Sequence, residues 1–303
     1  MKRLEARARA LEDARSFFES RGFLEVETPT LVPSPGLDLH LSAFEVKTRG
    51  PGLYLGTSPE YQMKRLLADG HGRIFQITRA YREDELGAHH NPEFTILEFY
   101  RAPGAMADTL RDTEQLVAKV TGGRVSLPGR SVSTLPPFER IRVCDAFARF
   151  AGIPEETTLG WAERDEDAFY RTLVSRVEPG LAALDHAVFL THYPAPQASL
   201  ARRAPEDPRV AERYELYVAG IELCNGFGEL TCPVEQRARF RKDQEERRAR
   251  GLPVYPVDER FLGALAGGIP ECSGNAIGFD RLAALAAGTT RIAEVMAFTG
   301  NEL

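Results

Sequence analysis

The chain has 303 residues, of which 43% are hydrophobic and 27% are charged, a composition typical of globular proteins with room for one large domain or two modest ones. Its formal net charge of −6 argues against a broad nucleic-acid footprint, because phosphate binding depends on Lys and Arg. Apolar stretches such as 282–287 are far shorter than the roughly 20 residues that cross a bilayer, and the amino terminus lacks a signal core. We therefore expect a cytoplasmic protein without membrane contact.

The amino-terminal segment to Arg21 carries apolar residues at helical spacing and stops before Gly22, so it predicts an amphipathic helix, with a strand over 23–26 after it. A second helix should begin at Ser58, Pro59 and Glu60 and end near Gly70, which places Glu60 in its first turn.

Further strands are predicted over 44–46, 53–55, 188–191, 214–218 and 221–224, and on both arms of a hairpin within 73–101. The middle, 105–185, is richer in helical patterns and in Pro and Gly breaks, and predicts a helical insertion within one domain over 1–303. In 237–250, basic residues mixed with acids at helical spacing favour a solvated helix face over an RNA contact. The fold class predicted is α+β, an antiparallel sheet with helices on one side.

The four cysteines, Cys144, Cys224, Cys232 and Cys272, show no CxxC spacing. A zinc site and a disulfide framework are therefore both disfavoured, and we expect reduced thiols that are mostly buried.

The hairpin over 73–101 carries the most informative chemistry. Arg82 offers a planar fork of donors to a phosphate, His90 and Asn91 add donors, and Phe94 offers a flat face to a base. From composition alone, a surface hairpin with solvated charges is an equal alternative. Nothing matches GxxxxGK[ST], and Gly226-Phe227-Gly228 lacks the third glycine of a dinucleotide fingerprint, so any nucleotide would be held by side chains.

Five segments in order resemble class II aminoacyl-tRNA synthetases of the lysine type. RAYREDELGAHHNPEF resembles motif 2, SRGFLEVETPTL resembles motif 1, and TSPEYQMKRLL resembles the amino-acid-binding segment; GIELCNGFGEL and GNAIGFDRL resemble the late acidic segment and motif 3. The resemblance implies the class II catalytic domain, an antiparallel sheet flanked by helices. It also implies a homodimer, since the motif 1 proline lies at the dimer interface in that family.

The resemblance assigns the nucleotide contacts. Arg82 would bind the α-phosphate of ATP and stabilise the transition state, and Arg281 would meet the far end of the triphosphate and sandwich the adenine with Phe94. An ion pair of Asp280 and Arg281 at a helix start is the weaker alternative for that motif. Glu215 and Glu222 match magnesium-binding acids. The other implied ATP contacts are Glu83, Asp84, His90, Asn91, Glu222, Leu223 and Gly278.

The implied amino-acid site comprises Ser58, Pro59, Glu60, Tyr100, Asn225, Glu229 and Ala276. A substrate with two ammonium groups needs acidic partners, and buried Glu60 and Glu229 with the Tyr100 hydroxyl would supply them. The alternative is that the two glutamates are exposed or paired with an arginine.

Departures from the synthetase pattern narrow the resemblance. Asp84 replaces the usual Glu, Glu83 the usual Asn and Cys232 a common acid, while Ala276 replaces a glycine near the backbone end of the amino acid. The chain also starts close to motif 1, without the anticodon-binding barrel of lysyl-tRNA synthetases.

These features, and HYPAPQASLA over 192–201, resemble the elongation factor P lysine ligase family. The resemblance implies that ATP activates (R)-β-lysine as an adenylate, that the acceptor is a lysine ε-amine of elongation factor P, and that tRNA is not a partner. Two alternatives stay open: a truncated lysyl-tRNA synthetase-like enzyme, and a non-catalytic paralog with a binding or regulatory role. Arg82, Glu222 and Arg281 count against the second. The sequence identifies neither the base of the transfer step nor the acceptor's docking surface.

Overall fold

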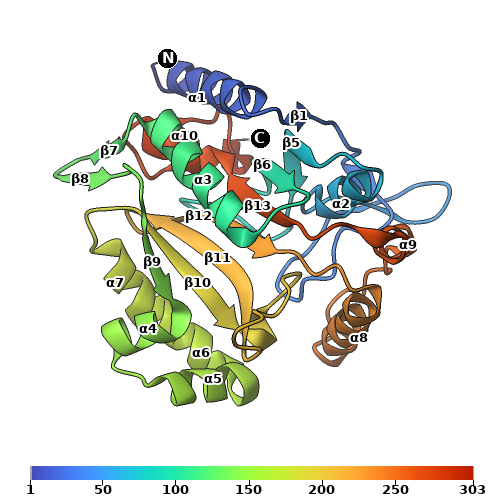
Figure 1. The fold of residues 1–303 in the computed structure, drawn as a ribbon. Helices are drawn as coiled ribbons and strands as arrows, with labels where there is room; N and C mark the ends of the chain where they lie inside the picture. The colour runs from blue at the N-terminus through green and yellow to red at the C-terminus, as the bar shows by residue number, and fades with distance from the viewer. Residues whose placement is uncertain (1, 303) are drawn as a thin grey trace.

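An eight-stranded, mostly antiparallel sheet organises residues 2–302, the part of the chain that the computed structural model describes (Figure 1). The strand order is β1 (Leu24–Glu25), β5 (Arg73–Tyr81), β6 (Glu93–Arg101), β13 (Ser273–Gly278), β12 (Ile221–Gly228), β11 (Val210–Val218), β10 (Val188–Pro194) and β9 (Glu139–Arg142). The edge strands β1 and β9 pair in parallel with their neighbours. Two small sheets accompany it: β2 (Leu31–Val32), β4 (Leu53–Leu55) and β3 (Glu45–Val46), and β7 (Arg124–Leu127) with β8 (Arg130–Ser133).

Three helices cover one face of the main sheet: α1 (Lys2–Glu19), α3 (Met106–Thr121) and α10 (Phe279–Ala286). Apolar residues at helical spacing point from them into the core, where Phe18 of α1 stacks on Phe75 with ring centroids 4.8 Å apart and lies 5.0 Å from Phe99. Leu116 of α3 and Leu282 of α10 complete this core. In Figure 1 the three helices lie together over the same part of the sheet.

The opposite face is covered at its two ends. Over β5 and β6 lie α2 (Glu60–Ala68), α8 (Pro233–Ala249) and α9 (Glu259–Gly268), and over β9 to β11 lie α4 (Val143–Ala146), α5 (Glu155–Arg164), α6 (Glu166–Thr172) and α7 (Glu178–Ala182). Figure 1 shows these groups on either side of β12 and β13. On this face neither group of helices packs on the middle strands β12 and β13, so a site can form between the groups.

Most predicted elements are confirmed, including the amino-terminal helix, the helix after Ser58, the long hairpin and the later strand pair. The α+β class is confirmed too, but helices cover both faces of the sheet and not one side as expected. Within 105–185 the structure has the expected helices together with β7, β8 and β9, which were not predicted. Because β9 joins the main sheet and α3 joins its core, these two elements of the segment belong to the main fold.

The helix predicted over 237–250 is confirmed as part of α8, and Arg247 is its one buried charged residue. Arg247 is fully buried, and it donates hydrogen bonds to the carbonyls of Pro253 at 2.6 Å and Asp38 at 2.6 Å while stacking on Tyr255. An arginine that is buried against carbonyl oxygens cannot be told from an exposed one in a sequence, because composition does not show what lies opposite the side chain.

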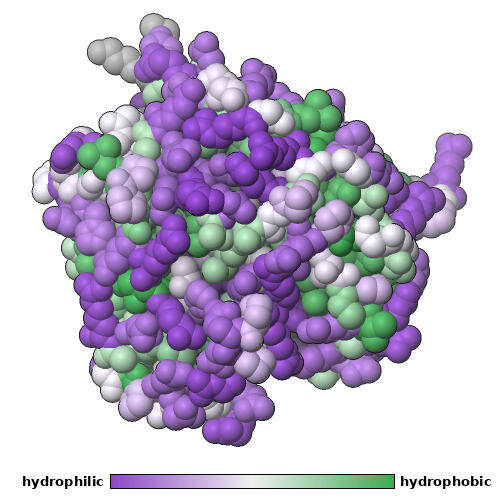
Figure 2. Space-filling view, in the orientation of Figure 1, coloured by the Kyte–Doolittle hydropathy of each residue, from purple (hydrophilic) through white to green (hydrophobic). Residues whose placement is uncertain are grey.

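Most of the cysteines are buried, as predicted. Cys144, Cys224 and Cys272 are buried and Cys232 is exposed, all as free thiols. In the described residues no helix combines the length and apolar character needed to span a membrane. Polar residues predominate on the face shown in Figure 2, with hydrophobic residues in scattered groups.

We predict that Phe18→Ala lowers the free energy of unfolding by about 3–5 kcal/mol, because it opens a cavity among aromatic rings that cannot collapse. Urea unfolding measures the change. Val234→Ala is the control, since Val234 is 77% exposed and its truncation should change stability by less than about 0.5 kcal/mol. A loss below about 1 kcal/mol for Phe18→Ala would contradict the packing described.

Candidate active site

Four residues form a row in register across the middle of the sheet. Glu98 of β6 lies opposite Ala276 of β13, Ala276 opposite Asn225 of β12, and Asn225 opposite Glu215 of β11. Alternate residues of a strand point to opposite faces of a sheet. The neighbours Phe99 and Ile277 therefore enter the core under α1, α3 and α10, and the row lies on the opposite face. The sheet thus connects predicted amino-acid and magnesium residues in one line.

Strand β13 forms the floor beneath this row with small residues. Gly274, Ala276 and Gly278 share the face of the row, while Asn275 and Ile277 are buried on the other. A Cβ atom on Gly274 would lie 2.2 Å from Tyr100 Cε1 and 2.7 Å from Glu229 Oε1. Close packing of Tyr100 and Glu229 therefore requires glycine here, and the Ala276 methyl is the one side-chain group on this stretch of the floor.

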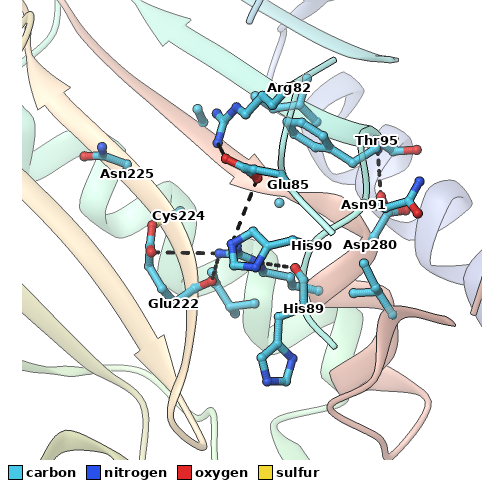
Figure 3. A pocket seen from close by; sticks show the side chains of 17 residues that line it. Arg82, Glu85, His89, His90, Asn91, Thr95, Glu222, Cys224, Asn225 and Asp280 are labelled. Atoms are coloured by element: carbon cyan, nitrogen blue, oxygen red, sulfur yellow. Dashed lines mark hydrogen bonds and ion pairs between the residues drawn. The ribbon is translucent and has the colours of Figure 1, made fainter. Parts of the chain in front are cut away.

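A cavity adjoins the row on the side of the predicted nucleotide site (Figure 3). Its lining comes from the β5–β6 loop, from β12 and β13, and from the start of α10. The predicted ATP and amino-acid residues among the lining are Arg82, His90, Asn91, Phe94, Glu222, Leu223, Asn225, Ala276, Gly278 and Arg281.

Arg281 ties three parts of this cavity together. It donates from Nη1 to the Glu222 carbonyl at 2.8 Å and from Nε to the His89 carbonyl at 3.1 Å, and its Nη2 lies 2.7 Å from His90 Nε2 (Figure 3). Burial and the neighbouring Arg281 charge lower the pKa of His90, so the imidazole is neutral near pH 7 and Nε2 accepts. The arginine is therefore held toward the cavity by backbone and a neutral ring.

Arg82 lies at the other side, with its guanidinium carbon 4.9 Å from the centre of the Phe94 ring. Its Nη1 is 3.4 Å from Glu85 Oε1, and among the described residues its buried Nε has no hydrogen-bond partner. A buried donor without a partner suits a site that receives acceptor oxygens from a ligand. Phe94 stacks here on Arg82, so its sandwich with Arg281 around adenine stays a prediction.

Only some of the loop residues that were predicted to contact ATP line the cavity. Glu83 and Asp84 are exposed and outside the cavity lining, with Asp84 in the left-handed region at φ 66°. Asn91 uses its amide within the fold, donating to the Glu93 carbonyl at 2.6 Å and accepting from Gly300 at 2.8 Å. Glu85, which the sequence analysis did not select, lines the cavity instead.

The two predicted metal ligands differ in surroundings. Glu215 is buried and accepts from Arg213 Nη2 at 2.6 Å and from the hydroxyls of Tyr193 and Tyr217 at 2.5 and 2.8 Å. Glu222 is less enclosed and lies 3.9 Å from Arg281 Nη1. Desolvation and the Glu215 charge raise the pKa of Glu222 to about 7, against the opposing charge of Arg281.

A cluster of buried acids occupies the amino-acid end of the row. Ser58 Oγ donates to Glu98 Oε2 at 2.6 Å and accepts from the Glu60 amide at 3.1 Å, which holds the start of α2, with Pro59 at its N-cap, against β6. The Tyr100 hydroxyl donates to Glu98 Oε1 at 2.5 Å. Burial, with the nearby Glu60 charge, raises the pKa of Glu98 to about 7.

Glu60 and Glu229 both contact a lysine, a partner that the sequence analysis did not consider. Lys64 Nζ lies 2.5 Å from Glu60 Oε1 and 2.6 Å from Glu229 Oε2, and its side chain is 1% exposed. Burial raises the pKa of Glu229 to about 8 although Lys64 acts to lower it. Glu229 is thus buried and Glu60 partly buried, with a lysine as their common partner, and their binding of a substrate stays a prediction.

Glu98 and Lys64 are the residues that the sequence analysis missed here. Each left a signal: Glu98 interrupts an apolar strand, and Lys64 follows Glu60 by four residues, which places both on one helix face. Neither signal reveals burial, because glutamate and lysine side chains are more often exposed.

The chain is similar to known proteins over nearly its whole length. The family described as tRNA synthetases class II (D, K and N) matches residues 1–302. The chain belongs to this family. The predicted family and fold are thereby confirmed, and the use of ATP follows from the class.

Curated relatives are similar over nearly the full length. Proteins named elongation factor P (R)-beta-lysine ligase from Klebsiella pneumoniae subsp. pneumoniae, Salmonella dublin and Salmonella agona are each 44% identical over 307 residues, covering 97% of this chain and 93% of the relative. The resemblance to that ligase family is confirmed at this level of identity.

We predict that Gly274→Ala weakens binding of the amino-acid substrate by about tenfold or more and leaves ATP binding within about twofold, because the added methyl displaces Tyr100 and Glu229 but not the cavity around Arg281. Calorimetric titration with each ligand measures both affinities.

The matched control is Gly263→Ala, where a Cβ meets nothing within 4 Å. Equal losses for both ligands in Gly274→Ala would indicate a general folding defect and contradict a local effect.

Proposed function

We propose that this chain is an ATP-dependent ligase that activates (R)-β-lysine as an aminoacyl-adenylate and transfers it to a lysine ε-amine of elongation factor P. The observation that carries the proposal is the row from Glu98 to Glu215, which joins a buried acidic cluster to a cavity faced by Arg82 and Arg281. Full-length similarity to ligases of that name supports it.

In the first step an oxygen of the substrate carboxylate attacks the α-phosphorus of ATP and pyrophosphate leaves. Negative charge develops on the phosphoryl oxygens, and a fixed guanidinium there stabilises the transition state more than the ground state. Arg82 supplies a buried unpartnered Nε on one side, and Arg281, held by the Glu222 and His89 carbonyls, meets the triphosphate on the other. The acids beyond Ala276 hold the ammonium groups of the substrate.

In the second step the neutral ε-amine of the acceptor attacks the adenylate carbonyl carbon, an amide bond forms, and AMP leaves with loss of one proton from nitrogen. Binding both partners in one cleft supplies the proximity that the step needs. Elongation factor P as acceptor is taken from the names of the relatives.

Magnesium fits this site as an ion bound together with ATP. Burial and, after it, the Glu215 charge raise the pKa of Glu222, and a divalent cation between these two carboxylates would relieve their repulsion. Within residues 2–302 no group of three or more His, Cys, Asp or Glu side chains is arranged for a metal, which agrees with an ion that takes its other ligands from phosphate and water. When bound, the ion would neutralise charge on the phosphates.

Pyrophosphate exchange tests the proposal directly. Purified protein with Mg²⁺ is assayed with (R)-β-lysine, with L-α-lysine and with no amino acid, and then with elongation factor P or bulk tRNA. Preference for β-lysine and label on the protein supports the ligase. Exchange with α-lysine and label on tRNA would make the chain a truncated synthetase, and no exchange with any amino acid would favour the non-catalytic paralog.

We predict that Arg82→Ala lowers the exchange rate roughly 100- to 1,000-fold, because it removes a donor aimed at the developing phosphoryl charge. Arg111→Ala serves as control, since Arg111 is 62% exposed on α3 and does not line the cavity. Exchange that survives Arg82→Ala within about threefold would refute this role.

A homodimer is part of the proposal. Motif 1 exposes Leu24 at 53% and Leu31 at 44%, with Pro29 also exposed between them. Large apolar side chains exposed on one short segment favour an interface over free solvent. The cytoplasmic location likewise stays a prediction from composition.

We predict that Leu24→Asp with Leu31→Asp converts a dimer to a monomer in sedimentation velocity, because two charges would be buried unpaired at the interface. The same change at two exposed apolar residues elsewhere, Val174→Asp with Val234→Asp, should leave the dimer intact. A monomeric parent protein, or a double variant that stays dimeric, would exclude this interface.

A further inference from the structure

Lys64 is a fully buried lysine that belongs to no assigned step of the reaction. It lies on α2 four residues after Glu60, and its ammonium contacts carboxylates from two elements, Glu60 at 2.5 Å and Glu229 at 2.6 Å. It also lies 5.9 Å above the Phe261 ring of α9. A charge buried this deeply is stable only where it is paired.

The charged and titratable groups around Lys64 come from every packed element. Glu60 lies on α2, Glu98 and Tyr100 on β6, Glu229 just after β12, and Cys272 just before β13. Two carboxylates thus pair with the one ammonium, and the third, Glu98, lies close enough to feel its charge. The cluster keeps two negative charges when all three acids are ionised.

The cluster also keeps unused acceptor capacity. Glu229 is 2% exposed, and of its two oxygens Oε2 faces Lys64 Nζ at 2.6 Å, which leaves lone pairs of the carboxylate for a further donor. A buried carboxylate oxygen in this state suits an additional donor from a ligand.

We propose that Lys64 is the positioning residue that sets the charge of the amino-acid site: its ammonium stabilises the carboxylates packed around it and leaves an excess of negative charge, which selects a substrate with two ammonium groups. This inference rests on the proposed function, because it concerns the same pocket. Lys64 acts through the two glutamates and not by touching the reacting atoms.

The expected pH dependence follows from the acids. An ammonium group binds a carboxylate well only when the acid is ionised, and burial raises the pKa of Glu98 to about 7 and of Glu229 to about 8. In the parent protein, KM for the amino acid should therefore fall as pH rises through this range. Lys64 lowers both pKa values, so its removal raises them and shifts the fall in KM to higher pH.

The test is pyrophosphate exchange by Lys64→Met and parent protein between pH 6.5 and 9.5, with KM measured for (R)-β-lysine and for ATP. We expect KM for the amino acid to rise about tenfold for each unit of pKa increase at neutral pH and to recover at high pH. KM for ATP should stay within about twofold. An unchanged amino-acid KM and pH profile, or an equal rise in both KM values, would overturn the inference.

A matched control is Lys242→Met, which removes a helical lysine with a glutamate four residues away but is 66% exposed. It should leave both KM values unchanged. If Lys64→Met does not fold, the double variant Lys64→Met with Glu229→Gln removes one charge of each sign. It should fold and bind ATP, with a raised amino-acid KM that no longer recovers between pH 7 and 9; parent-like amino-acid binding by this variant would overturn the inference.

Parent protein that exchanges with no lysine-like amino acid would refute the proposed function itself. That outcome is separate from a parent that exchanges while Lys64→Met behaves identically, which would refute the role of Lys64 alone.

Discussion

The register of β13 is the constraint on which the site depends. A slip by one residue would turn Ala276 into the helix-covered core and bring Asn275 and Ile277 out among the acids. Two polar anchors hold this register from the core side: Asn275 Nδ2 donates to Thr113 Oγ1 of α3 at 2.7 Å, and Ser273 Oγ donates to the Phe227 carbonyl at 2.6 Å. Buried hydrogen bonds of this kind contribute more to specificity of pairing than to stability.

A second coupling joins the amino-terminal helix to the nucleotide cavity. Arg7 of α1 pairs with Asp280 at 2.5 Å and donates to Thr95 Oγ1 at 2.7 Å, while Asp280 accepts from the Thr95 amide. Thr95 follows Phe94, and Asp280 precedes Arg281, so one buried network supports both neighbours. The surface segment that follows α1 is the one proposed to pair with a second copy, and it therefore adjoins the helix that carries Arg7.

The sequence was sufficient for the elements with strong local patterns and for the motifs that carry the chemistry. Both arms of the β5–β6 hairpin are rich in apolar, β-branched and aromatic residues, and Ser58 with Pro59 begins a helix by a known mechanism. Strand β13 was missed because its glycines give no strand signal, and its pairing is fixed by neighbours distant in the sequence. Lys64 and Glu98 were missed for a related reason: their importance lies in burial and mutual approach, which only the assembled sheet creates.

The floor beneath the substrate row also limits how such a pocket can diversify. Backbone and one methyl form that floor, so substitution there can only take room away, and strand geometry sets the maximum depth. The rim is different, because single changes among its acids and its lysine alter charge without moving the sheet. Redesign of this pocket for another amine-bearing acid would therefore keep the shape of the floor and change the charged residues around it.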